Sequence, residues 1–81
     1  MDYRSLRQAA RRQPFEPFRL TLTTGEKYDI RHPDLIMVGR QAIIIGLPLD
    51  DKEPVFDETI KIDLFHIVSI AELPKKNKAK Q

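Results

Sequence analysis

Three side chains in this sequence have the chemistry to move a proton or to bind a metal: His32, Asp34 and His66. A metal site needs three or four converging ligands, yet the chain has no cysteine and its other carboxylates are scattered. We interpret His32 as a residue that orients the bend at Pro33 by a backbone hydrogen bond, and His66 as part of a later corner. An enzyme would need a pocket that gathers all three side chains. We expect no enzyme, no metal and no cofactor.

Arginines form the second chemically capable group, because all five basic residues within positions 1–19 are arginine. A guanidinium presents a planar fork of N–H donors that matches the oxygens of a phosphate. The alternative is a solvated helix face, with some of its charges paired to Asp2 or to an acidic loop. The residues expected to contact phosphate are Arg4, Arg7, Arg11, Arg12 and Arg19.

The formal net charge of +2 conceals three regions of different sign. Residues 1–19 carry a net charge of +3, residues 20–73 of −5, and residues 74–81 of +4. Basic ends can meet an anionic partner by counterion release, although basic tails also serve solubility. The lack of cysteine fits a reducing compartment, and residues 1–5 lack the apolar core of a signal peptide. We expect a cytoplasmic, soluble protein with no membrane-spanning segment.

Aromatic residues flank the arginines and permit two interpretations. Tyr3, Phe15 and Phe18 could form a platform on which single-stranded bases stack. They could equally attach the N-terminal helix and its connector to the rest of the protein. We favour the second interpretation, because little else in residues 1–17 is apolar.

The element that must position most of the arginines is a helix over residues 2–12. Asp2 is a suitable N-cap, and Pro14 prevents the helix from continuing. The apolar stripe of this helix is too narrow to stabilise it alone, so we expect it to dock on a sheet. The stripe consists of Tyr3, Leu6 and Ala10.

The segment from Phe18 to Ile30 predicts an antiparallel hairpin. Apolar and polar residues alternate on both sides of Gly25, and glycine adopts a positive φ at low cost. Similar patterns predict further strands over residues 35–38, 41–46, 59–65 and 67–73.

Two local expectations concern burial. The run from Ile43 to Ile45 cannot point all its side chains one way, so both faces of that strand should be covered. Residues 47–58 form a long acidic loop, in which Val55 and Phe56 should be pinned to the body of the protein. We expect one domain over residues 1–74, followed by a disordered basic tail at 75–81.

The order of these elements resembles that of small SH3-like barrels, and most closely the Sm-like branch. Residues 20–25, LTLTTG, are similar to the first Sm-like strand, and Arg11 and Arg12 are similar to the basic rim helix of the bacterial Sm-like RNA chaperones. Residues 64–70, LFHIVSI, resemble the segment that holds a Tyr-Lys-His triplet in those chaperones, of which His66 alone is matched. The resemblance implies a mainly β fold, a barrel of about five antiparallel strands with one N-terminal helix. It also adds His66 to the expected RNA contacts.

A second resemblance covers most of residues 14–70. The pattern Pro-Phe-x-Pro-Phe-Arg, a Gly turn and a His-Pro-acidic triplet is similar to a group of small uncharacterised bacterial proteins. This resemblance implies a bacterial source and carries no activity with it.

We therefore predict a non-catalytic binding module that binds single-stranded RNA in the manner of Sm-like proteins. The alternative is a protein-interaction or scaffold module that uses a sheet edge or the acidic loop to bind a protein partner. A small barrel that is not fully closed keeps unpaired strand edges. For that reason we also predict a homo-oligomer.

Overall fold

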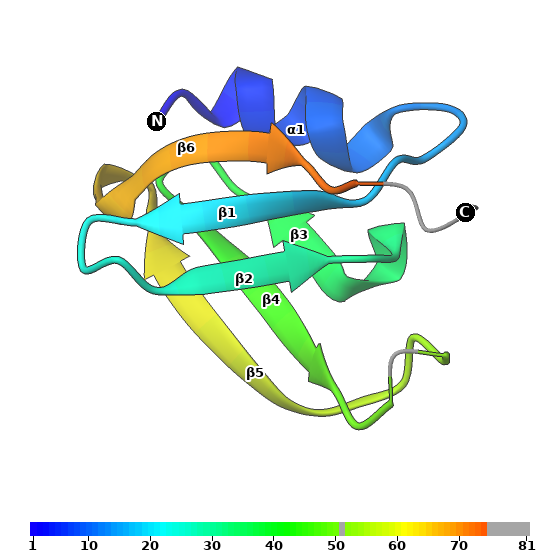
Figure 1. Cartoon of the computed structure of the whole chain (residues 1–81). Coiled ribbons are helices and arrows are strands. Elements are labelled where there is room, and N and C mark those ends of the chain that lie inside the picture. The colour runs from blue at the N-terminus through cyan, green and yellow to red at the C-terminus, as the bar shows by residue number, and fades with distance from the viewer. Residues whose placement is uncertain (51, 75–81) are drawn as a thin grey trace.

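The computed structural model describes residues 1–50 and 52–74. Its α-helix, α1 (Tyr3–Arg11), lies beside two antiparallel sheets of three strands each (Figure 1). The carboxylate of Asp2 accepts a hydrogen bond from the backbone N–H of Arg4 at 3.1 Å, so the expected N-cap is confirmed. The helix ends at Arg11, because the backbone of the next residue, Arg12, is extended.

The first sheet has the strand order β2-β1-β6 and consists of β1 (Phe18–Leu22), β2 (Lys27–Ile30) and β6 (Ile67–Glu72). The expected hairpin between β1 and β2 is confirmed. Gly25 has a φ of 93°, and its N–H donates to the carbonyl of Leu22 at 2.9 Å. β6 pairs antiparallel with the other side of β1.

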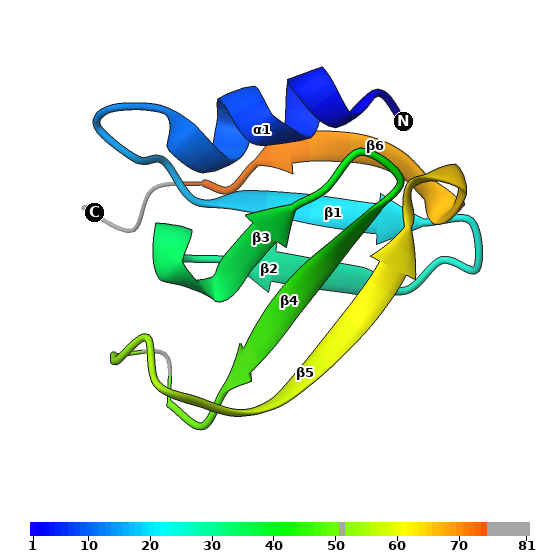
Figure 2. The same cartoon turned by 180° about the vertical axis from the view of Figure 1, so that it is seen from behind.

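The second sheet has the order β3-β4-β5 and consists of β3 (Ile36–Val38), β4 (Ala42–Pro48) and β5 (Phe56–Asp63). Two short 3₁₀ turns connect the sheets: η1 (Pro33–Leu35) joins β2 to β3, and η2 (Leu64–His66) joins β5 to β6. The strands of the second sheet run obliquely across those of the first (Figure 2). The chain therefore passes from one sheet to the other at two corners.

One hydrophobic core lies between the two sheets and α1. Each fully buried large side chain in it contributes roughly 1.5–3 kcal/mol relative to an exposed one. Leu6 and Ala10 of α1 join this core as expected, and Tyr3 packs against its edge. The largest fully buried side chains are Leu6, Leu20, Ile30, Ile43 and Ile45.

The mainly β fold with an N-terminal helix is confirmed, whereas its details differ from the expected barrel. The described residues form six strands, and the two sheets do not close into one barrel. Pro33 cannot donate a hydrogen bond to a ladder, and the turn η1 interrupts the chain between β2 and β3. Each sheet consequently keeps two unpaired edges.

Two burial predictions were wrong. Ile44 lies on the outer face of the second sheet and is 39% exposed, because no described element covers that face. Val55 is 56% exposed and Phe56 is 44% exposed, although the Phe56 ring does lie over Gly46. β4 and β5 also reach further than expected, which shortens the loop to residues 49–55. The predicted tail at 75–81 lies outside the described residues, as does residue 51.

Candidate functional site

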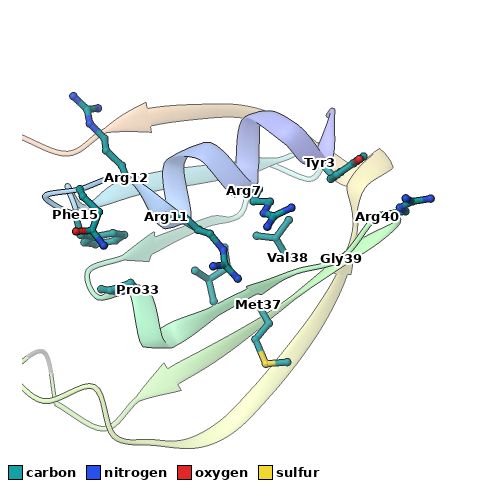
Figure 3. A pocket seen from close by; sticks show the side chains of 13 residues that line it. Tyr3, Arg7, Arg11, Arg12, Phe15, Pro33, Met37, Val38, Gly39 and Arg40 are labelled. Atoms are coloured by element: carbon teal, nitrogen blue, oxygen red, sulfur yellow. The ribbon is translucent and has the colours of Figure 1, made fainter.

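Helix α1 aims two of its arginines at strand β3. Leu6 and Ala10 face the core, so the flank of the helix next to them carries Arg7 and Arg11, four residues apart. α1 packs beside β3 in the structure, and these two side chains extend between the helix and the strand (Figure 3). The docking of one apolar stripe therefore fixes where both guanidinium groups lie.

The space between α1 and β3 is a groove with a volume of about 920 Å³. One wall is the helix with the connector that follows it, and the other is β3 with its two neighbouring turns. Ala10, Ile36 and Val38 make part of its lining apolar. The described residues that line it include no carboxylate, and its basic residues are Arg7, Arg11, Arg12 and Arg40.

The four arginines of the groove differ in whether a carboxylate already holds them. Arg12 is paired, at 3.5 Å to Glu16 and 3.1 Å to Glu72, and its side chain points away from β3 (Figure 3). Within residues 1–50 and 52–74, no ion pair involves Arg7, Arg11 or Arg40. These three guanidinium groups keep their donors for solvent or a ligand.

Arg19 lies apart from the groove and is held by Asp29. The two residues face each other across β1 and β2, and their side chains form two parallel hydrogen bonds of 2.7 and 3.1 Å. The hydrogen bond from Arg19 holds the pKa of Asp29 below its ordinary value of 3.8, and the same bond raises the pKa of Arg19. The donors expected to meet a phosphate therefore already meet a carboxylate.

Arg4 lies on the solvent side of α1. Its guanidinium lies 5.8 Å from the centre of the Tyr3 ring, within the range of a cation–π contact. Arg4 borders a shallow hollow over the helix that it shares with Arg7 and Arg11. It can therefore extend the positive surface of the groove along the helix.

The aromatic residues divide between core and groove. Phe18 is 2% exposed, so for this residue the interpretation as a core side chain is confirmed. Phe15 packs on Phe18 with ring centres 6.0 Å apart and also lines the groove. Tyr3 lines the groove as well, which gives it aromatic surface beside its cations.

The two histidines lie outside this groove. His32 accepts a hydrogen bond at Nδ1 from the backbone N–H of Asp34 at 3.1 Å, which confirms that it orients the bend at Pro33. His66 ends η2, and its carbonyl accepts from the N–H of Thr23 at 2.8 Å. The His66 side chain lines a separate hollow between the β1–β2 hairpin and β5. The structure thus does not bring His66 together with the arginines at one site.

Sequence reasoning missed Arg40, which follows the end of β3 and joins the groove from the turn before β4. Its only signal was a basic residue next to Gly39 in a predicted turn. Nothing in the local sequence indicates that this turn lies near the N-terminal helix. The two are brought together because α1 packs beside β3.

Within the described residues, no three side chains of His, Asp or Glu gather as metal ligands would. Nowhere in residues 1–50 and 52–74 does a helix reach the length and hydrophobicity that crossing a bilayer requires. No protein-family model, curated protein or solved structure matches this chain. The family resemblances drawn from the sequence therefore stay predictions.

Proposed function

We propose that this protein is a non-catalytic module that binds single-stranded RNA in the groove between α1 and β3. The observation that supports this most directly is the pair of guanidinium groups of Arg7 and Arg11 beside a groove lined without carboxylates, with Arg40 at the end of the groove (Figure 3). Such donors bind phosphate oxygens, and aromatic side chains beside them offer surfaces on which unpaired bases stack. Tyr3 and Phe15 supply those surfaces.

A single strand suits this groove better than a duplex. Sequence-independent binding to a duplex needs a wide positive face, whereas the middle of this chain is acidic. A groove with apolar lining, aromatic rings and few cations instead matches a chain whose bases are unstacked and accessible. The predicted contact set is Arg4, Arg7, Arg11 and Arg40, with Arg12 and Arg19 held by carboxylates and His66 outside the groove.

We propose in addition that the fold is a variant of the small SH3-like or Sm-like barrel. β2 and β3 follow each other through η1 and belong to different sheets, as the two halves of one bent strand would. Counted as one, they reduce the strands to five, which supports the predicted architecture. A bacterial cytoplasm is the compartment we assign to such a module.

The test is fluorescence anisotropy with a labelled oligouridylate at low and high salt. The double variant Arg7→Gln/Arg11→Gln should bind at least about tenfold more weakly, and its salt slope should fall by roughly 0.7 for each lost phosphate contact. The matched control is Lys27→Gln/Lys52→Gln, which removes the same charge outside the groove and should keep most of the affinity. If both variants lose affinity equally, the binding is diffuse and the groove is not the site.

The alternative function, a protein-interaction module, is favoured by a different surface. On the outer face of the second sheet, Met37 is 64% exposed and its cross-strand neighbour Ile44 is 39% exposed, and Phe56 lies over Gly46 on the same face. Contiguous exposed apolar surface of this kind often marks a protein contact. A wild-type protein that does not bind RNA at low salt would place this alternative first.

A further inference from the structure

The pattern of hydrogen bonds in the second sheet shows which N–H and carbonyl groups of β5 point away from β4. The N–H of Leu64 donates to the carbonyl of Gln41 at 2.9 Å, at the end of the antiparallel ladder between β4 and β5. Bonded pairs alternate along such a ladder, so the residues of β5 that exchange bonds with β4 are Ile62, Ile60 and Glu58. The N–H and carbonyl groups of Thr59, Lys61 and Asp63 therefore point to the unpaired edge.

β5 is the longest edge strand in the described part of the molecule, and its residues 60–63 share a hollow with the β1–β2 hairpin. It is the longest strand, it pairs with β4 alone, and in both views it forms the border of the molecule (Figures 1 and 2). Between Glu58 and Asp63 it has no proline and no register shift, which are two devices that blunt an edge, and its charged residues Lys61 and Asp63 blunt it only mildly. By contrast, α1 lies beside β3, and Ile70 of β6 borders the hollow over α1.

Side-chain charges distinguish the registers in which two copies of this edge could pair. A two-fold antiparallel pairing centred on Lys61 would place two lysines opposite each other, and one centred on Ile60 would place Asp57 opposite Asp63. A centre at Ile62 overlaps only the last residues of the strand. A centre at Thr59 overlaps Phe56 to Ile62 and places the Lys61 side chain of each copy opposite Asp57 of the other, at the point where β5 shifts its register against β4.

We propose that β5 is a homodimer interface, at which two copies of this chain pair edge to edge and antiparallel with Thr59 on the two-fold axis. The result is a continuous sheet of six strands, β3-β4-β5 from each copy. Thr59 opposes its own symmetry mate, and two Lys61–Asp57 pairs flank it. The interface is isologous and leaves the groove between α1 and β3 unoccupied, so it does not depend on RNA binding.

The chain has no cysteine, so single-cysteine variants report this register directly. Residues directly opposite in a hydrogen-bonded antiparallel pair have Cα atoms about 5.5 Å apart, which a disulfide can span. Under mild oxidation Thr59→Cys should become a covalent dimer at least about tenfold faster than Lys61→Cys, whose copies lie several residues apart in this register. Equal rates would indicate random collision and would overturn the proposal, as would a faster Lys61→Cys.

Charge exchange and a backbone substitution test the same interface in solution by sedimentation. Lys61→Asp should weaken the dimer at least about tenfold by opposing like charges, and Asp57→Lys/Lys61→Asp should restore it. Thr59→Pro removes an N–H from the free edge only, so it should yield a folded monomer. A wild type that is monomeric at millimolar concentration contradicts the dimer, and a ring of more than two copies contradicts the two-fold pairing.

Discussion

Arg19 and the pair Arg7 and Arg11 are the same residue type at the surface of the same small protein, yet their surroundings leave them with opposite roles. Arg19 lies on a strand whose neighbour places Asp29 directly opposite, and two hydrogen bonds hold its guanidinium. Arg7 and Arg11 lie on a helix beside β3, where the lining residues include no carboxylate. The first arginine stabilises a hairpin, and the other two remain available to a ligand.

This difference shows that an arginine keeps its donors available only where its neighbours supply no acceptor. A guanidinium keeps its charge in every environment, so its protonation does not distinguish the two cases. What differs is whether an acceptor already occupies the fork, because a new ligand must then compete with that acceptor. The three predictions below test this contrast, starting with the largest expected effect.

Shortening the buried Leu6 side chain, which holds α1 against the core, should abolish the difference between the helix arginines and Arg19. Leu6 is fully buried and holds the helix against the core. Leu6→Ala should lower the free energy of unfolding by about 2–5 kcal/mol, measured by chemical denaturation. RNA affinity should fall with it, since Arg7 and Arg11 lose their fixed position. A variant with the expected loss of stability and unchanged affinity would show that the helix need not be docked for binding.

Replacing the two helix arginines by lysine keeps their charge but removes the forked donors, and it should have an intermediate effect on RNA affinity. Arg7→Lys/Arg11→Lys preserves two positive charges and removes the planar arrangement of donors. We expect affinity for oligouridylate to fall by about three- to tenfold by anisotropy, with an almost unchanged salt slope. Arg19→Lys serves as the control and should leave RNA affinity unaltered. Wild-type affinity in the double variant would mean that charge alone, without the fork, determines binding.

Breaking the pair in the hairpin should have the smallest effect, and one visible mainly in acid. The pKa of Asp29 is lowered in the folded protein, so its stabilising contribution is present above its ordinary value of 3.8. That contribution is lost as the pH falls through the lowered pKa. Between neutral pH and strong acid, wild-type protein should therefore lose more stability than Asp29→Asn, as followed by thermal melts. RNA affinity at neutral pH should change by less than about twofold.

Much of the fold was predictable because it depends on local patterns. Asp2 caps α1 by accepting a hydrogen bond from the backbone two residues further on, and Gly25 allows the hairpin turn. The alternation of apolar and polar residues located the strands. The bend at Pro33 was also predictable, since His32 bonds to the backbone two residues further on. Each of these features depends on contacts within a few residues.

Burial on the outer face of the second sheet was not predictable in the same way. The run around Ile44 indicated coverage on both sides, but covering a face requires another element to be placed there. No described element lies over it, and the same three isoleucines would be compatible with either outcome. Only the path of the chain through η1 and η2 decides which faces of the sheets meet.

Local sequence patterns account for the mainly β composition of the fold and its N-terminal helix, and the excess of arginine at that end is visible directly in the sequence. The sequence did not determine which arginines are available, because Arg19 and Asp29 are brought together by the register of β1 with β2. Arg40 reaches the groove from a turn distant in sequence, by the packing of α1 beside β3. Ion pairing and groove formation depend on distances between separate segments, and the tertiary structure alone sets those distances.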